Sequence, residues 1–461
     1  MDLSVLSVLV RRYAAGCNPR EVAWVVFGQI FVAGGIFLNV IALTRLLTPQ
    51  EYGVVALGLA IAAVFQQALW GALGNAMNRF YATSLEQESS RCLMRAGLRF
   101  AKRIVMLSLA VASVSFLMSQ LFVIDWLGTI PISTLLSIGV GYTATLDGVQ
   151  NAARRRSVST LHQTFGQLCR LGVACGLVIF VRATGMMVLV GYSVASALTS
   201  VSATLLARSI STKSPPRTGA PAMDWNQRIW GFAWPIVGWG ILSSIQNGSD
   251  RWSLELAGHS EAVGLYGAIH QIGYYPVLLI GTAVSQLVMP VLFEIAGDGS
   301  DRERLRRSVR LAVVLCRITL VVSLFGALVA LVVHRQVFSV VFAEQYRSVS
   351  DLWPLSVAAG GLFVAGQFVA MIPMSFAKSE LLLVPFAGTA FAGIVFNAAG
   401  ASIAGIPGVS LGVLLTSLLY FIGPVTAARR LLRQPPRNQP ACQSEPASTL
   451  VTPANVDKSG G

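Results

Sequence analysis

Two arginines lie deep inside long apolar stretches of the sequence. Arg170 is about nine residues into the stretch 161–181, and Arg317 is about eight residues into the stretch 309–333. A charged side chain at the centre of a membrane helix costs at least about 2.5–3.5 kcal/mol, so each needs an explanation. The guanidinium group is a flat fork of hydrogen-bond donors that suits phosphate oxygens. The two arginines therefore predict a binding site for a phosphorylated substrate.

The neighbours of the two arginines differ. Gln163 and Gln167 share a helical face with Arg170, so this stretch carries a polar stripe that suits a cavity wall. The residues around Arg317 (LAVVLCRITLVV) are apolar. The alternatives are that Arg170 hydrogen-bonds to neighbouring helices and that Arg317 extends to the cytoplasmic face of the membrane.

Further polar stripes occur in the second, seventh and eighth apolar stretches. Such stripes either line water or join helices, and their occurrence together favours a shared cavity. Arg45 and Arg251 are expected at the outer mouth, where an anion would be released. The predicted substrate-binding residues are Arg170, Arg317, Arg79, Arg45, Arg251, Asp250, Gln67, Asn75, Gln167, Asn247 and His270.

The elements that position these residues are membrane helices. The chain has 461 residues, of which 54% are hydrophobic and only 12% are charged, whereas soluble domains carry about 25% charged residues. The apolar residues come in blocks of roughly 20, the length that crosses about 30 Å of hydrocarbon. This composition predicts an all-α polytopic membrane protein and argues against a water-soluble enzyme. The twelve expected spans are 22–43, 52–74, 102–124, 131–151, 161–181, 185–207, 228–248, 262–288, 309–333, 351–373, 381–403 and 407–428.

A linker rich in Ser, Pro and basic residues lies between the sixth and seventh spans and divides them into two sets of six. The polar tail cannot bury a core and is expected to be disordered. The predicted domains are a cytoplasmic N-terminal segment (1–21), an N-lobe (22–207), a cytoplasmic linker (208–227), a C-lobe (228–428) and a disordered cytoplasmic tail (429–461).

The distribution of basic residues predicts the orientation. With a cytoplasmic N-terminus, 27 Lys and Arg fall in cytoplasmic segments and five in outer loops. This bias is typical of bacterial membrane proteins and predicts that both termini are cytoplasmic. It also accounts for the formal charge of +14 without a nucleic-acid partner.

The two halves repeat a loop pattern. The first half has Arg45, then Glu51-Tyr52-Gly53, and the second half has Arg251, then Glu261 and Gly264, at an offset of about 206–210 residues. In each, an arginine closes one span and a glutamate followed by a glycine opens the next. Parallel repeats of this kind usually flank a central cavity in transporters.

The stretch RLLTPQEYGVVALGLAI and the segment 71–82 resemble the polysaccharide biosynthesis family of O-antigen and exopolysaccharide flippases. That family belongs to the multidrug/oligosaccharidyl-lipid/polysaccharide exporter superfamily. The resemblance implies two pseudo-symmetric six-helix lobes around a cationic cavity in the bacterial inner membrane. It further implies translocation of an undecaprenyl-diphosphate-linked oligosaccharide from the inner to the outer leaflet, beside a polysaccharide polymerase and a chain-length regulator. The fourteen-span peptidoglycan-precursor flippases match less well, because no extra pair of helices is found.

The source of energy stays open in the sequence. None of the four lysines follows a glycine, so the chain has no phosphate-binding loop for ATP, and no cofactor or metal is expected. Membrane potential suffices in principle, while His162, His270, Asp147 and Asp250 leave proton or sodium antiport possible.

Two other functions compete with a flippase. One is a multidrug or organic-cation antiporter of the same superfamily, although the deep charges are arginines rather than carboxylates. The other is a membrane polysaccharide polymerase or ligase, against which the short outer loops argue. For a flippase, Arg170→Ala and Arg317→Ala are both expected to abolish surface polysaccharide.

Overall fold

The computed structural model describes residues 19–86, 89–122, 125–153, 155–211, 224–296, 302–376 and 378–433. The regular structure in these ranges is helical throughout, as expected for an all-α protein. Most of the predicted N-terminal segment, most of the linker and nearly all of the tail lie outside the described residues, so the predicted domain boundaries stay predictions.

The first half of the chain forms seven α-helices, two of them joined by a π-helical turn, and a short 3₁₀ turn. Its elements are α2 (Pro19–Leu46), α3 (Pro49–Phe65), the π turn η1 (Gln66–Trp70), α4 (Gly71–Glu86), α5 (Ser90–Leu121), the 3₁₀ turn η2 (Asp125–Gly128), α6 (Thr129–Ala152), α7 (Arg156–Phe180) and α8 (Gly185–Ser211). Because α3, η1 and α4 follow one another without a break, they form one continuous helical segment.

The second half has longer and more broken helices. Its elements are α9 (Trp225–Leu256), α10 (Ser260–Ile272), α11 (Tyr274–Ala296), α12 (Arg302–Val341), the 3₁₀ turn η3 (Glu344–Leu352), α13 (Trp353–Ser375), the 3₁₀ turn η4 (Ser379–Leu382) and α14 (Leu383–Arg433). Helix α14 is bent at Gly405, whose φ of 61° and ψ of −129° are not helical. A residue with a side chain is strained at such a positive φ, so the glycine divides α14 into the two arms that the sequence predicts.

Nine helices of the described residues are long and apolar enough to cross a membrane, and one of them covers both arms of α14. Helices α2 and α9, with 28 and 32 residues, lie outside these nine but are also long enough to span it. This arrangement is compatible with the twelve expected spans. Large apolar side chains such as Phe325 and Val332 are 67% and 75% exposed on the outer surface, which suits contact with lipid. The protein is thus a multi-pass membrane protein.

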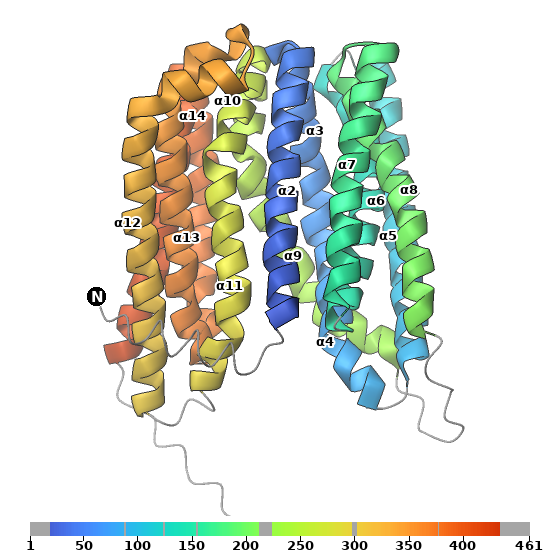
Figure 1. The fold of residues 1–461 in the computed structure, drawn as a ribbon, viewed down its shortest axis with the longest axis vertical. Coiled ribbons are helices and arrows are strands. Elements are labelled where there is room, and N and C mark those ends of the chain that lie inside the picture. The colour runs from blue at the N-terminus through green and yellow to red at the C-terminus, as the bar shows by residue number, and fades with distance from the viewer. Residues whose placement is uncertain are drawn as a thin grey trace, which may run out of the picture.

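The helices gather in two groups with a cavity between them. Figure 1 shows α4–α8 on one side, α10–α14 on the other, and α2, α3 and α9 in the middle. Helix α9 packs against α3 and α4 of the first half and against α14 of the second. The central helices therefore join the two halves and carry many of the side chains that line the cavity.

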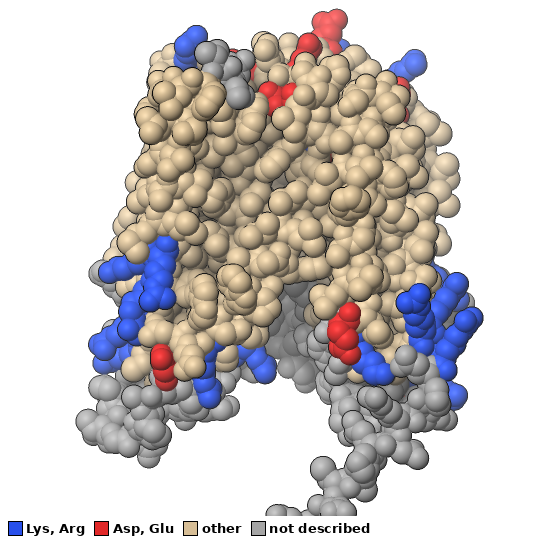
Figure 2. Space-filling model, turned by 180° about the vertical axis from the view of Figure 1, so that it is seen from behind, with Lys and Arg blue, Asp and Glu red and all other residues tan. Residues whose placement is uncertain are grey.

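The two ends of the molecule differ in charge. Basic side chains gather at the end where α5 and α12 begin and α14 ends, and the molecule is hollowed there between the halves (Figure 2). We call this the basic end, and the opposite end the closed end.

The closed end is held by the loop motif that the two halves repeat. Thr48 caps α3 by accepting a hydrogen bond from the backbone N–H of Glu51, with Pro49 in the first turn. A Cβ on Gly53 would lie 2.7 Å from the carbonyl oxygen of Ser260, and one on Gly264 would overlap the carbonyl of Pro49. Only glycines allow α3 and α10 to touch backbone to backbone, and this contact closes the cavity above the site.

Candidate functional site

A cavity of about 380 Å³ lies between the two halves. Helices from both halves contribute to its wall, and most of the polar side chains come from the central helices and from α10 and α11. Its polar lining residues are Asn39, Tyr52, Gln66, Gln67, Gln167, Arg170, Tyr192, Ser244, Gln246, Asn247, Asp250, Arg251, His270, Gln271, Tyr274, Tyr275, Asn397, Thr416 and Ser417.

The structure brings seven of the eleven predicted site residues to this cavity. They are Arg170, Gln167, Gln67, Asn247, Asp250, Arg251 and His270. These residues come from both halves, as a shared cavity requires. Their contact with a substrate stays a prediction, because the cavity shows only where they lie.

Arg170 of α7 enters the cavity wall without a carboxylate partner among the described residues. Its Nε donates to the carbonyl oxygen of Gly166 on the preceding turn at 3.3 Å, and the phenol groups of Tyr192 and Tyr275 are its electrostatic neighbours. The hydroxyl of Tyr192 donates to Asn39 Oδ1 at 2.6 Å, which fixes the ring beside the arginine. The terminal nitrogens of the guanidinium are therefore available to an anion in the cavity.

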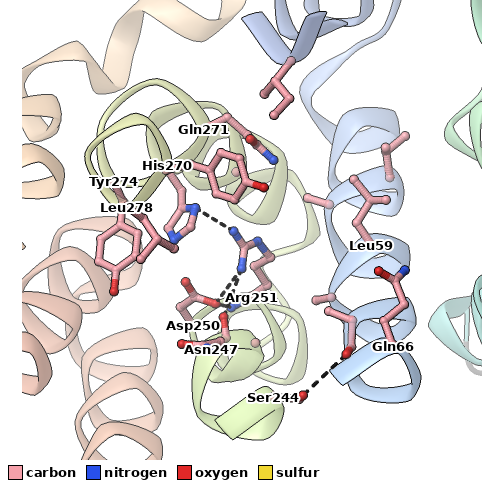
Figure 3. A pocket seen from close by; sticks show the side chains of 18 of the residues that line it. Leu59, Gln66, Ser244, Asn247, Asp250, Arg251, His270, Gln271, Tyr274 and Leu278 are labelled. Atoms are coloured by element: carbon pink, nitrogen blue, oxygen red, sulfur yellow. Dashed lines mark hydrogen bonds and ion pairs between the residues drawn. The ribbon is translucent and has the colours of Figure 1, made fainter. Parts of the chain in front are cut away.

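Arg251 of α9, in contrast, is held by protein groups on several sides (Figure 3). Its Nη1 is 3.2 Å from Asp250 Oδ1 and donates to the carbonyl of Asn247 at 3.3 Å. Its Nη2 lies 2.9 Å from Nδ1 of His270. Because a guanidinium can only donate, Nδ1 of His270 must accept. The imidazole is thus neutral in this arrangement, with its proton on Nε2.

The charges of the cavity leave a positive balance. Among the lining residues only Arg170, Arg251 and Asp250 carry a formal charge when His270 is neutral. Arg251 and Asp250 offset each other, so the net charge is that of Arg170. A cavity with one unpaired guanidinium in a low-dielectric wall attracts anions.

Arg317 does not reach the cavity, which corrects its predicted place. It is exposed on the outer surface of α12, and Val321 and Leu324, on the same helical face, are 67% and 63% exposed. The face of α12 that carries Arg317 is exposed, whereas Leu315 and Cys316, its neighbours in the sequence, are buried in the core on the opposite face. Of the two membrane arginines, only Arg170 lines the cavity.

Arg79 and Asn75 of α4 are exposed and are not lining residues of the cavity either. In an unbroken α-helix, Asn75 would share one face with Gln67, and that face would end beside Arg79. The π turn η1 inserts wider i→i+5 hydrogen bonding at residues 66–70, which changes the rotation of α4 relative to α3. Gln66 and Gln67 therefore face the cavity, while the polar residues that follow do not.

Arg45 lies at the closed end, where it joins the two halves instead of lining the cavity. Its Nη2 donates to the carbonyl of Val340 on α12 at 2.8 Å. Nearby, Gln345 Nε2 and the hydroxyl of Tyr346 both donate to the carbonyl of Leu47, at 2.9 and 3.2 Å. These hydrogen bonds link the α2–α3 connection to the second half and seal the cavity from this end.

The sequence interpretation missed several cavity residues, among them Asn39, Tyr192 and Gln271. Asn39 could have been found as an isolated amide in an apolar span. Tyr192 and Gln271 have no comparable signal, because tyrosines and glutamines near helix ends are common in any membrane protein. Within the described ranges, no three His, Cys, Asp or Glu side chains gather in a way that would hold a metal ion.

The fold is similar to those of solved transporters. A lipid II flippase MurJ in an inward closed conformation is 12% identical, with a TM-score of 0.66 over 89% of this chain and 88% of that one. A multidrug resistance MATE family transporter of the MOP superfamily in an outward-facing conformation is also 12% identical, with a TM-score of 0.54 over 90% and 97%. A mutant of the Vibrio cholerae MATE transporter VcmN is 14% identical, with a TM-score of 0.57 over 93% and 98%.

At the level of sequence, no curated protein matches the chain. The family described as "Polysaccharide biosynthesis protein" matches residues 19–296, which is more than half of the chain. The similar solved structures are a flippase and transporters. From its sequence match and its helical cavity-containing fold, the protein belongs to the polysaccharide biosynthesis protein family.

Proposed function

We propose that this protein is a flippase for an undecaprenyl-diphosphate-linked oligosaccharide, the repeat unit of an O-antigen or exopolysaccharide. It moves this lipid from the inner to the outer leaflet of the bacterial inner membrane. The observation that carries the proposal is Arg170, a guanidinium in the wall of a membrane cavity with no carboxylate partner among the described residues. A diphosphate is the anionic group that such a lipid would bring to it.

The cavity offers separate surroundings for each part of the substrate. The diphosphate would bind Arg170, and the amides and hydroxyls of Gln67, Gln167 and Asn247 would hydrogen-bond to the sugars. The isoprenoid tail would stay in the lipid, which avoids burying an apolar chain in water or a charged group in hydrocarbon. A volume of about 380 Å³ suits a diphosphate and the adjoining sugar, so a longer glycan needs the hollow at the basic end.

The proposed orientation places the basic end in the cytoplasm, in accordance with the positive-inside bias. Helix α2 begins there and α14 ends there, so both termini would be cytoplasmic. The substrate anion would then enter from the cytoplasm, and an inside-negative potential would favour its outward movement by roughly 2.3 kcal/mol per charge per 100 mV. A polymerase and a chain-length regulator would use the lipid on the outer side.

A cation antiporter is the second candidate, and the similarity to MATE transporters and the presence of Asp250 in the cavity favour it. Such a transporter needs a carboxylate that is available to the cation. Asp250 is instead 3.2 Å from Arg251, and the unpaired charge of the cavity is positive. The charge balance therefore favours the flippase.

The test compares two arginines of the same membrane region. Purified protein is reconstituted with a fluorescent undecaprenyl-diphosphate oligosaccharide, and a membrane-impermeant glycosidase reports how much glycan crosses. Arg170→Gln should slow the crossing by about tenfold or more, because a hydrogen bond to a charged group contributes about 1.5–3 kcal/mol. Arg170→Lys should retain part of the rate, since it keeps the charge.

Arg317→Gln is the matched control. In this variant the glycan should cross at the wild-type rate, because Arg317 is exposed outside the cavity. An Arg170→Gln variant as fast as wild type would overturn the proposal. Expulsion of an organic cation that depends on Asp250 would support the antiporter instead.

A further inference from the structure

A second pair of ionisable side chains is buried inside the first half of the protein, away from the cavity. Asp147 of α6 and His162 of α7 are 5% and 6% exposed, and neither is a lining residue of the cavity. Each lies within about two turns of the basic end of its helix. Burying an aspartate and a histidine in a membrane helix bundle is costly unless the two side chains hydrogen-bond to each other.

The hydrogen bonds of His162 use both ring nitrogens. Nδ1 is 3.0 Å from Asp147 Oδ1. Nε2 is 2.8 Å from the hydroxyl oxygen of Ser202 and 3.2 Å from the carbonyl oxygen of Thr199. The Ser202 hydroxyl itself donates to that same carbonyl of Thr199, at 2.9 Å. When the serine proton bonds to that carbonyl, which can only accept, Nε2 carries a hydrogen and donates it.

The contact between Nδ1 and Asp147 then requires one more proton. With Nε2 protonated, a neutral imidazole presents a lone pair at Nδ1, and an ionised carboxylate also presents only lone pairs. Two lone pairs at 3.0 Å repel each other. A proton must therefore lie between them, either on Nδ1 as an imidazolium–carboxylate pair or on the aspartate as a neutral pair. Both descriptions give the pair the same proton count.

No other charged group competes for this proton in the part of the chain that the structure describes. The only charge interaction resolved at either side chain is with its partner. Helices α4, α2 and α8 present neutral groups, namely Asn78 beside Gly148, the Trp24 backbone beside Thr160, and Thr199 and Ser202. Helix α5 presents the charged Arg91 and Arg95, which line a separate pocket with Thr145 and Leu146 of α6.

Loss of the proton would disturb the contact between α7 and α8. The remaining proton would move to Nδ1, where it could still bond to Asp147, and Nε2 would become an acceptor. The Ser202 hydroxyl would then have to turn from Thr199 to Nε2, leaving the Thr199 carbonyl facing the lone pair of Nε2 at 3.2 Å. This repulsion acts directly between α7 and α8.

The same helices line the cavity farther along. Arg170 lies two turns beyond His162 on α7, Tyr192 lies on α8, and Val140 lies on α6. We infer that Asp147 and His162 form a proton-binding site, and that release of its proton loosens α7 from α8 and thereby moves the arginine of the cavity. If the proposed flippase function holds, this site makes flipping a proton-coupled exchange.

The proton itself can be observed without any substrate. The protein has four histidines, and labelling their nitrogens allows NMR of the full chain in lipid nanodiscs to report the protonation of each ring. His162→Gln assigns the signal. At neutral pH Nε2 of His162 should carry a proton, and Nδ1 should share a second proton with Asp147. A single titration step at higher pH should remove the shared proton.

Two variants and a control sharpen this measurement. Asp147→Asn should leave a neutral His162 throughout the neutral range, and Ser202→Ala should shift the pH of the step while keeping the fold. His334→Gln, which removes a histidine that bonds to Ser350, should leave the His162 signal unchanged. Ring nitrogens of His162 that show no change with pH in the wild type across the range, as in Asp147→Asn, would overturn the proton site.

The coupling is tested separately in vesicles that contain the fluorescent lipid-linked oligosaccharide. A pH gradient, acidic on the receiving side, should accelerate flipping by the wild type severalfold and leave Asp147→Asn unaffected, while a membrane potential should still drive the variant. Equal acceleration of both proteins would overturn the coupling. If no protein flips the lipid, the proposed function fails, whereas the NMR result still decides the proton site.

Discussion

The two arginines of the cavity differ in what surrounds them. Arg251 is 9% exposed and has Asp250, His270 and a backbone carbonyl within hydrogen-bond distance. Arg170 has one backbone carbonyl. A buried charge that is already paired has little left for a ligand, whereas an unpaired one gains from each anion that approaches. We therefore propose that Arg251 stabilises the structure around α9 and that Arg170 binds the substrate.

This assignment makes a prediction about stability. Arg251→Met removes the positive charge that faces the buried Asp250 carboxylate and should lower the free energy of unfolding by about 3–5 kcal/mol. Asp250→Asn should also destabilise, because it leaves the guanidinium uncompensated. The double variant should recover most of the loss, since it removes both charges together. Unfolding of the purified proteins in detergent, followed by circular dichroism, measures the three differences. Additive losses in the double variant would contradict the pairing.

At the scale of the elements, the contact between α3 and α10 closes the cavity. Both helices begin with the repeated loop motif, and each contributes a glycine, Gly53 or Gly264, to the contact. A close backbone approach of this kind is possible only without a Cβ. The pseudo-equivalent helices of the two halves thus form a seal that must open if the substrate is to leave at the closed end.

Gly264→Ala should prevent this seal from forming. The added Cβ would overlap the carbonyl of Pro49, a backbone atom that cannot rotate away. With the native cysteines replaced and a single cysteine introduced at Gln246 in the cavity, an impermeant maleimide added at the closed end should react about tenfold faster than in the parent, the rate change that a shift of roughly 1.4 kcal/mol produces.

Gly238→Ala supplies the control for this labelling. Its Cβ would meet no atom within 4 Å, so the labelling rate should equal that of the parent. Because alanine is favoured over glycine inside a helix by roughly 0.5–1 kcal/mol, this variant should not be less stable. Equal labelling of the Gly264 and Gly238 variants would show that α3 and α10 do not form the seal.

The two ends of the whole molecule differ along the axis that crosses the membrane. Its basic end is hollowed between the halves, and its closed end is sealed by the α3–α10 contact and by the hydrogen bonds of Arg45, Gln345 and Tyr346. A transporter closed at one end and open at the other has its site accessible from one side of the membrane. In the proposed orientation, which rests on the distribution of charge, this side is the cytoplasm.

The orientation can be tested with fusions to the full chain. A green fluorescent protein at the C-terminus should fluoresce, and an alkaline phosphatase at the same place should be inactive, because fluorescence requires the cytoplasm and phosphatase activity the outer side. Phosphatase inserted between α7 and α8, at residues 181–184, should be active. The reverse pattern would place the basic end outside and would contradict the direction of transport proposed above.

Much of the fold follows from the sequence, and the match to the polysaccharide biosynthesis protein family confirms the resemblance. The helical membrane class is also confirmed, and the observed helices are compatible with the twelve expected spans. These features are local: about twenty apolar residues must form a helix in lipid because every backbone polar group needs a partner. The polar stripe around Arg170 is local too, since residues three and four apart share a face.

The tertiary structure decided which way each helix turns and which polar groups meet. Arg317 faces outward because of how α12 packs, and the π turn η1 separates Asn75 from the face of Gln67. Arg45 bonds across the two halves, and His162 meets Asp147 and Ser202 from three different helices. Hydropathy fixes that a helix crosses the membrane but not its rotation, because in lipid that rotation is set by contacts with neighbouring helices.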